Sequence, residues 1–345
     1  MSAGAVEMCR ANPRRTHFFS AGVVSLLLIG PAPAAATGDA AQGSSPAGFN
    51  PFAGRRLYVD PNSSAQRQAE TWKRSRPSDA VVIAEIANQP SAKWFGGWVQ
   101  NIRREVNQAV ATITSADALP VFVAYNIPAR DCGSYSVGGS STADAYRRWI
   151  QDFGLGIGRR SAIVILEPDA LAGMDCLDAA GRQERVTLIR EAVQRLKRQR
   201  ASVYIDAGNA KWHPPAEMAR RLQQAGIGDA AGFALNVSNV QATSLNIAYG
   251  EQLSRLVGGK HFIIDTSRNG IPGTDPTPWC NPRGRALGVA PTTNTGHPLV
   301  DAFLWVKTPG ESDGTCGGGP PAGTWWPAYA LELSRMAGTL ARTLR

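Results

Sequence analysis

Residues 162–166, Ala-Ile-Val-Ile-Leu, run directly into Glu167-Pro168-Asp169, and this junction decides the fold. Five consecutive apolar residues, most of them β-branched, predict a strand buried on both faces, as in a parallel sheet. An amphipathic helix is expected after Asp178, with an apolar face formed by Val186, Ile189, Val193 and Leu196. The stretch therefore predicts one strand–helix unit whose strand ends in carboxylates.

Similar apolar runs recur along the chain and alternate with amphipathic segments. The expected strands begin near Leu57, Val81, Val121, Ala162, Ser202, Gly232, His261 and Ala302. The pattern predicts an α/β fold, a distorted, TIM-barrel-like (β/α) barrel of seven to eight parallel strands. A doubly wound open sheet is the alternative, but no G-x-G-x-x-G follows the first strand, which argues against a dinucleotide-binding version.

The N-terminal residues have the features of a secretory signal. A basic region at Arg10, Arg14 and Arg15 precedes an apolar run from Phe18 to Ile29, and small residues follow it. We expect residues 1–36 to be a signal peptide, residues 37–50 a flexible lead-in and residues 51–345 one domain. An uncleaved membrane anchor is the alternative. The prediction is a secreted, extracellular protein without membrane association after cleavage.

Composition and cysteine count narrow the class further. Of 345 residues, 43% are hydrophobic and 18% charged, which is typical of a globular protein. The formal net charge of +9 is spread over helices and does not form an aromatic-rich basic patch, so we expect no nucleic-acid partner. Four cysteines remain if Cys9 leaves with the signal, which suggests two disulfides with three possible pairings.

Polar residues follow the ends of nearly all these strands. Those that end a strand or come shortly after it are Tyr125, Asp131, Glu167, Asp169, Asp206, Asn236, Asp265, Lys307, Glu311 and Asp313. In a parallel barrel these ends share one face, the face that carries active sites. A single aspartate there is usually a helix cap, but carboxylates at successive strand ends indicate a functional site.

Three chemistries could use such a ring of carboxylates. A metal site would normally include histidine, but only His213, His261 and His297 remain after the signal, and His261 begins a strand, at the opposite end of the barrel. The one G-x-S-x-G match, Gly310–Gly314, is followed by a Gly/Pro-rich stretch and not by a helix, so it lacks the strand-to-helix turn of a nucleophile elbow. We therefore predict no metal and no cofactor, and favour a carboxylate pair acting on a sugar, with nearby tryptophans as platforms.

Three motifs then resemble glycoside hydrolase family 6, the cellulases that invert configuration at β-1,4-glucosidic bonds. They are Tyr125-x-x-Pro128-x-Arg130-Asp131-Cys132, residues 163–171 around Glu167-Pro168-Asp169, and Trp305-Val306-Lys307-x-Pro309-Gly310-Glu311-Ser312-Asp313-Gly314. They occur in the family's order and, with flanking residues from Trp94 to Trp326, span nearly the whole domain. The resemblance implies hydrolysis of a β-1,4-glucan.

The resemblance also implies roles for the catalytic residues. Asp169 would be the general acid, and Asp131 would raise the pKa of Asp169 through like-charge repulsion. Asp313 would be the base, acting through a water chain that includes Ser136. Tyr125 would press on the sugar in the −1 subsite. An inverting pair should stand roughly 6.5–9.5 Å apart.

Further residues follow from the same resemblance. Substrate-binding side chains are expected at Trp94, Ser136, Asp206, Trp212, Asn236, Trp279, Lys307 and Glu311. The implied disulfides are Cys132–Cys176 and Cys280–Cys316. Trp305 lies within an apolar strand and is expected in the core. Arg268 either orients carboxylates or holds its loop through an ion pair.

The length of the loops bears on the mode of cleavage. The segments from Asp131 to Ala143 and from Thr308 to Thr324 are too short to cover a cleft as in chain-end enzymes. We expect an open cleft and internal cleavage by a monomeric endo-β-1,4-glucanase. The alternatives are an exo-acting cellobiohydrolase, an enzyme for another β-glucan such as a mixed-linkage chain, and a non-catalytic glucan-binding protein on the same fold.

Overall fold

The computed structural model describes residues 50–273 and 278–343. The expected signal peptide and all but the last residue of the expected lead-in lie outside these residues. Within the described part of the chain, no helix is long and apolar enough to cross a membrane.

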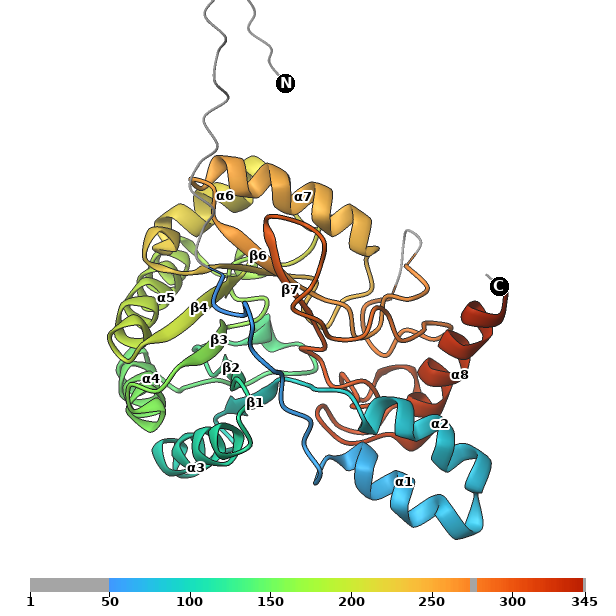
Figure 1. The fold of residues 1–345 in the computed structure, drawn as a ribbon. Coiled ribbons are helices and arrows are strands. Elements are labelled where there is room, and N and C mark those ends of the chain that lie inside the picture. The colour runs from blue at the N-terminus through green and yellow to red at the C-terminus, as the bar shows by residue number, and fades with distance from the viewer. Residues whose placement is uncertain (1–49, 274–277, 344–345) are drawn as a thin grey trace, which may run out of the picture. The chain divides into compact units, whose positions relative to one another are not determined.

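Seven parallel strands form one curled sheet in the order in which they occur in the sequence (Figure 1). They are β1 (Lys93–Gly96), β2 (Val121–Tyr125), β3 (Ala162–Leu166), β4 (Ala201–Asp206), β5 (Gly232–Leu235), β6 (His261–Asp265) and β7 (Val300–Leu304). The predicted distorted barrel is confirmed, with seven strands. The doubly wound alternative is wrong, because its strand order would reverse partway along the sheet.

Helices connect the strands and cover the outside of the sheet. The helices are α1 (Ser64–Ser75), α2 (Pro77–Ala87), α3 (Ile102–Ser115), α4 (Ala143–Ile157), α5 (Ala179–Arg198), α6 (Pro215–Gln224), α7 (Thr243–Leu256) and α8 (Pro327–Thr343). The predicted helix after Asp178 is α5, and the Asp178 side chain caps it by accepting from the N–H of Gly181. Helices α3 to α7 follow the outer face, whereas α1, α2 and α8 pack together at one side (Figure 1).

The strands bury both of their faces, as their apolar runs predict. Along β3, Ile163 and Ile165 belong to a core inside the barrel, whereas Val164 and Leu166 pack against the outer helices. Phe52, fully buried, joins the inner core and packs against Tyr204. Because side chains fill the barrel, only the strand ends remain available for a site.

Two of the predicted strands are wrong, and one strand was not expected. Val81 lies in α2, where it is exposed while Ile83 and Ile86 are buried, a helical spacing. Leu57 makes only an isolated bridge with Leu119. The first strand is instead β1, whose sequence Lys-Trp-Phe-Gly has no apolar run to reveal it.

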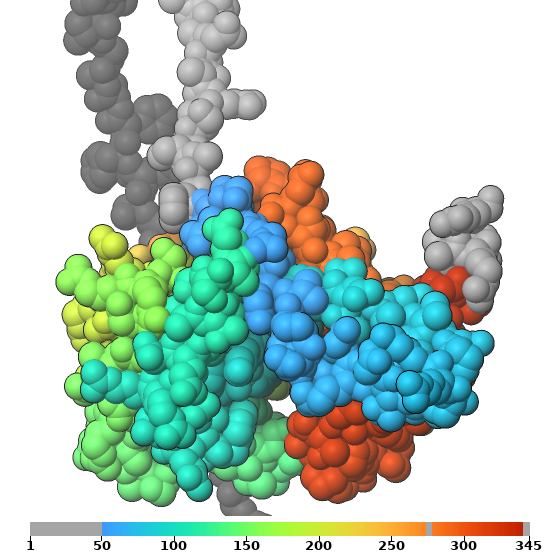
Figure 2. All heavy atoms as spheres, turned by 60° about the horizontal axis from the view of Figure 1, so that its bottom comes forward, coloured from blue at the N-terminus to red at the C-terminus, as the bar shows by residue number. Residues whose placement is uncertain are grey.

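The sheet does not close, because β1 and β7 form no ladder with each other. Two hydrogen bonds connect the two sides of the gap. The backbone N–H of Ala92 donates to the Trp305 carbonyl oxygen at 3.0 Å, and the indole Nε1 of Trp94 donates to the Val306 carbonyl oxygen at 2.7 Å. In Figure 2 a hollow opens between the teal elements and the red C-terminal region, while the blue and cyan elements lie against the red region.

Candidate active site

A cavity of about 1580 Å³ lies at the carboxyl ends of the strands and extends into this gap. It exceeds the 300–1,000 Å³ typical of small-molecule sites, so it has room for a long ligand. Most of the predicted site residues line it: Trp94, Tyr125, Asp131, Ser136, Asp169, Trp212, Trp279, Lys307, Glu311 and Asp313. Segments far apart in the sequence therefore meet here, as the strand-end argument predicts.

Asp169 stands on the turn after β3, one residue beyond Pro168. Its φ of 65° is left-handed, as is the φ of 50° at Glu167. Such strained conformations concentrate at functional sites. The Asp169 N–H donates to Asp206 Oδ1 at 2.9 Å, which fixes the turn from below. The Asp169 Oδ1 atom is buried and has no hydrogen-bond partner, which is unusual for a purely structural carboxyl group.

The surroundings of Asp169 favour its protonated form. Burial raises its pKa well above the usual range, and the nearby carboxylates of Asp206, Asp131 and Asp313 raise it further. A carboxyl group whose pKa is raised in this way binds its proton more strongly than an ordinary aspartate, as a general acid requires.

Asp131 lies on the short loop after β2, at a φ of 57°. Its Oδ2 accepts the backbone N–H of Ser136 at 2.8 Å. The guanidinium of Arg130 donates to the carbonyl oxygens of Ser136 at 2.9 Å and Tyr125 at 2.8 Å, so this side chain holds the loop against the strand end. Burial raises the pKa of Asp131, although the Ser136 N–H and Arg130 oppose the shift.

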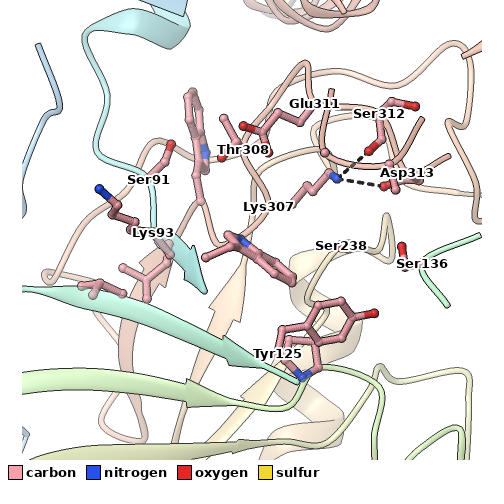
Figure 3. Close-up of a pocket in the computed structure, with 18 of the residues that line it drawn as sticks. Ser91, Lys93, Tyr125, Ser136, Ser238, Lys307, Thr308, Glu311, Ser312 and Asp313 are labelled. Carbon is pink, nitrogen blue, oxygen red and sulfur yellow. Dashed lines mark hydrogen bonds and ion pairs between the residues drawn. The ribbon is translucent and has the colours of Figure 1, made fainter. Parts of the chain in front are cut away.

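Asp313, in the loop after β7, has the opposite electrostatic environment. The fully buried Arg268 donates to its Oδ2 at 2.7 Å, and the N–H of Asn281 donates to the same oxygen at 2.8 Å. Lys307 Nζ lies 3.3 Å from Oδ1 (Figure 3). Burial opposes ionisation, but Arg268 and Lys307 outweigh it and hold the pKa of Asp313 below its ordinary value. Arg268 therefore orients the carboxylate itself.

The cavity thus combines a carboxyl group whose pKa is raised with one whose pKa is lowered. This is the division of states that general acid–base chemistry requires of two carboxyl groups. The two aspartates are chemically identical and both are buried, but their neighbours shift their pKa values in opposite directions. Carboxylates surround Asp169, and cations surround Asp313.

Aromatic and polar side chains surround these carboxyl groups. The Trp94 ring meets Tyr125 edge-on at a centroid distance of 5.3 Å. Trp212 and Trp279 are 39% and 47% exposed, so their rings are available for stacking. In Figure 3, Thr308 and Glu311 lie on the side of the cavity opposite Tyr125. Burial raises the pKa of Glu311, with Lys307 opposing the shift. Trp305 is buried in the core, as predicted.

Asp206 and Asn236 lie beneath the cavity and not on its wall. The Asp206 carboxylate accepts the N–H groups of Asp169 and Gly208, and burial raises its pKa to about 7. Asn236 is fully buried, and its amide donates to the carbonyl oxygen of Asp265 at 2.9 Å. The structure therefore places these two side chains where they support the loops and do not reach the cavity.

Both expected disulfides are present, Cys132–Cys176 and Cys280–Cys316. The first joins the Asp131 loop to the segment that follows Asp169. The second joins the loop after β6 to the segment that follows Asp313. They therefore brace the loops that carry the three key carboxyl groups.

Sequence reasoning missed a contact between two of these loops. The Tyr135 ring lies 5.8 Å from that of Trp279, and a Cβ placed on Gly314 would approach the Tyr135 side chain at 2.5 Å. Tyr135 thus connects the loop after β2 with the loops after β6 and β7. Arg130 and Asn281 were also given no role. No local pattern reveals these residues, because their partners lie on other loops.

The histidines take part elsewhere. His213 Nε2 is 2.7 Å from the Ala172 carbonyl oxygen, His297 contacts Glu251, and His261 lies 2.8 Å from Asp301 at the amino-terminal end of β6. Among the residues that the structure describes, no cluster of three or more His, Cys, Asp or Glu side chains is placed to hold a metal ion.

A parallel barrel with two carboxyl groups of oppositely shifted pKa beside aromatic side chains is the arrangement of a glycoside-cleaving enzyme. The sequence model of the glycosyl hydrolases family 6 matches residues 52–337, and the chain belongs to this family. The resemblance carried by the three motifs is thereby confirmed.

Individual relatives support this placement. Over 283 residues, 81% of this chain, it is 45% identical to endoglucanase A of Cellulomonas fimi and spans 61% of that protein's length. It is 42% identical to endoglucanase 1 of Streptomyces halstedii over 80% of this chain and 88% of the relative. The structure of an endoglucanase from Mycobacterium tuberculosis, solved with methyl-cellobiosyl-4-deoxy-4-thio-β-D-cellobioside, superposes with a TM-score of 0.80 at 45% identity, covering 84% of this chain and 100% of that one.

Proposed function

We propose that the protein is a secreted, inverting endo-β-1,4-glucanase that hydrolyses internal bonds of cellulose or a related β-glucan. The observation that carries the proposal is the opposite shift of two carboxyl groups in one cavity, with the pKa of Asp169 raised and that of Asp313 lowered. The endoglucanase relatives, at 42–45% identity, supply the bond and the mode of cleavage.

Bond cleavage in this proposal is a single displacement. Asp169 donates its proton to the glycosidic oxygen while the bond from that oxygen to the anomeric carbon breaks. A water molecule attacks the anomeric carbon from the opposite face and loses a proton towards Asp313, through a second water held near Ser136. Asp131 stays beside Asp169 and supports its raised pKa. The products are two shorter chains, one of which has a new reducing end with inverted configuration at its anomeric carbon.

The remaining side chains bind the glucan. Tyr125 presses on the sugar at the scissile position, and Lys307 and Glu311 bind hydroxyls of the neighbouring unit. Trp94, Trp212 and Trp279 offer flat apolar surfaces to successive pyranose rings. Asp206 and Asn236 contribute by fixing the turns beneath the acid and beneath Asp265.

Short loops favour internal cleavage. The loop after β2 ends where α4 begins at Ala143, and the segment after β7 ends at α8, which begins at Pro327. Neither is long enough to roof a tunnel by itself. An exo-acting cellobiohydrolase remains the second candidate, because the contact of Tyr135 with Trp279 joins loops from different strands near the catalytic residues.

Export is part of the proposal. The expected signal peptide at residues 1–36 would direct the protein out of the cell, where a monomer would act on glucan without a cofactor. Two disulfides are consistent with an oxidising compartment.

Product analysis tests the proposed function. On soluble carboxymethyl-cellulose, an endo enzyme lowers viscosity early, when few reducing ends have formed. NMR of fresh cello-oligosaccharide products should show the α-anomer first, as inversion requires. Slow loss of viscosity with cellobiose as almost the sole product would favour the exo candidate. Lack of hydrolysis on a panel of β-glucans would favour the non-catalytic glucan-binding protein.

A further inference from the structure

Arg185 of α5 is a buried arginine that the proposed mechanism leaves unused, and it is only 3% exposed. Its guanidinium donates to the carbonyl oxygens of Pro128 at 2.7 Å, Ala129 at 2.9 Å and Ala170 at 3.2 Å. Pro128 and Ala129 belong to the loop after β2 that carries Asp131, whereas Ala170 belongs to the turn after β3 that carries the proposed acid. One side chain therefore joins the two loops.

Glu167 holds the loop after β2 with the opposite charge. Its buried carboxylate accepts the backbone N–H groups of Asn126 at 2.9 Å and Ile127 at 3.0 Å. Across residues 126–129 a carboxylate thus takes two donors and a guanidinium takes two acceptors. Burial lowers the pKa of Arg185, and Glu167 opposes that shift. Because buried charges are costly unless their hydrogen bonds are made, both side chains hold this loop in one position.

Arg221 of α6 is a second buried arginine beneath the site, and it is 4% exposed. It donates to the carbonyl oxygens of Leu171 at 2.7 Å and Ala172 at 3.2 Å and forms ion pairs with Asp175 and Glu217. None of these four partners belongs to the loop after β2. The two arginines are therefore similarly buried and hold neighbouring parts of one segment, but they differ in whether they also reach that loop.

We propose that Arg185 is a positioning residue for the proposed hydrolysis, which keeps the Asp131 carboxyl group at the distance from Asp169 that the reaction requires. The inference rests on the proposed function, in which Asp131 supports the raised pKa of the acid. The Cys132–Cys176 disulfide joins the same two loops, but it leaves the chain after Asp131. Arg185 thus fixes the segment that precedes Asp131, and the disulfide fixes the segment that follows it.

Arg185→Lys tests this role, because lysine keeps the charge but lacks the planar fork that reaches both loops. On cellohexaose we expect kcat to fall by about tenfold, with KM little changed. If Asp131 moves away, the pKa of Asp169 falls, so the basic limb of the kcat/KM profile should move to lower pH by roughly 0.5–1. Asp206 and Asp313 also raise the pKa of Asp169, but they lie on other loops.

Two comparisons decide whether the effect runs through Asp131. The matched control Arg221→Lys should lower the melting temperature to a similar degree without moving the basic limb. In the Asp131→Asn background, Arg185→Lys should cause no further movement, because the repulsion from Asp131 is already absent. An unmoved limb in Arg185→Lys, the same movement in Arg221→Lys, or equal movements in both backgrounds would overturn the inference and leave the proposed function intact. A wild-type enzyme inactive on β-glucans would instead overturn the proposed function.

Arg185→Gln provides the test if the lysine variant does not fold. It removes a cation, and that loss alone would raise the pKa of nearby carboxyl groups. Movement of the basic limb to lower pH in this variant therefore reports a displaced loop and not the lost charge. A limb that stays in place or moves to higher pH in folded Arg185→Gln would overturn the positioning role.

Discussion

Two aspartates at opposite ends of the barrel show what decides whether a buried carboxyl group is structural or reactive. At the amino-terminal end, Asp301 accepts the Tyr204 hydroxyl at 2.5 Å and lies 2.8 Å from His261 Nδ1. At the carboxyl end, Asp169 has a buried oxygen without a partner. Burial raises the pKa of both, but Tyr204 and His261 oppose the shift at Asp301, whereas carboxylates increase it at Asp169.

The difference indicates which end contributes stability and which end contributes function. A satisfied buried carboxyl group stabilises the fold, because each of its hydrogen bonds would be lost on unfolding. An unsatisfied group among like charges is costly to the folded state and is retained where chemistry needs it. Substitution of the two aspartates should therefore have opposite consequences for stability and activity.

Asp169→Asn should have the largest effect on activity. Because the amide cannot donate the required proton, we expect kcat on cellulose to fall by about 10²–10⁴-fold. Stability should be unchanged or slightly higher, because like-charge repulsion disappears. Hydrolysis rates on carboxymethyl-cellulose and thermal melts measure both. A dinitrophenyl cellobioside, whose leaving group needs no proton, should retain most of its rate; full activity on cellulose would remove Asp169 from the role of acid.

Arg268→Ala should damage both stability and activity. It leaves Asp313 buried without its main cationic partner, a change that typically costs about 3–5 kcal/mol. The low pKa of Asp313 should rise, so the acidic limb of the kcat/KM profile should move to higher pH. Arg268→Lys, which keeps the charge, should shift the limb less. An unmoved limb in a folded Arg268→Ala protein would mean that the limb does not report Asp313.

The Arg268–Asp313 pair also predicts how stability changes with pH. The folded-state pKa of Asp313 is depressed, so its contribution to stability is present above the ordinary aspartate pKa and is lost as pH falls through the lower folded value. Denaturant unfolding of the wild type and of Asp313→Asn, followed from pH 6 downward, measures this. The stability difference between the two proteins should shrink as the solution becomes more acidic; a constant difference would contradict the assignment.

Asp301→Asn should show the opposite pattern to Asp169→Asn: lower stability with unchanged activity. We expect a loss of about 1–3 kcal/mol in the free energy of unfolding, because the bonds to Tyr204 and His261 are weakened in a buried site. The kcat at a temperature where the variant is folded should stay at the wild-type value, since Asp301 is remote from the cavity. Asp152→Asn, an exposed change on α4 outside the cavity, is the control. A fall in kcat without loss of stability would contradict the division between the two ends.

The site at the carboxyl ends of the strands was largely predictable from sequence. The cluster of Tyr204, His261 and Asp301 at the other end of the barrel was not. Asp131, Asp169 and Asp313 follow strands directly or lie in motifs just beyond them, so the fold class alone brings them together. The Arg268–Asp313 bond joins residues 45 apart, and Tyr204–Asp301 joins residues 97 apart. Such pairs depend on loop conformation and sheet register, which no local pattern encodes.

The first strand shows the same limit of sequence reasoning at the level of secondary structure. Residues 81–83, Val-Val-Ile, form a short apolar run, and such a run fits a strand or a buried helix equally well. The packing of α2 against α1 and α8 decides for the helix. By contrast, β1 is defined by its pairing with β2, and its Lys-Trp-Phe-Gly sequence carries too few apolar residues to predict it.

Tyr135→Ala should have the smallest effect on stability and activity. It concerns only how a glucan chain enters the cavity at the carboxyl ends of the strands. Loss of the ring contact with Trp279 should change stability by no more than about 1.5 kcal/mol. Because the contact joins loops on different sides of the cavity, its removal should ease entry of internal chain segments. The drop in carboxymethyl-cellulose viscosity per reducing end should therefore increase. Val137→Ala, an exposed change on the same loop, is the control, and equal behaviour of the two variants would show that Tyr135 does not limit access to the acid.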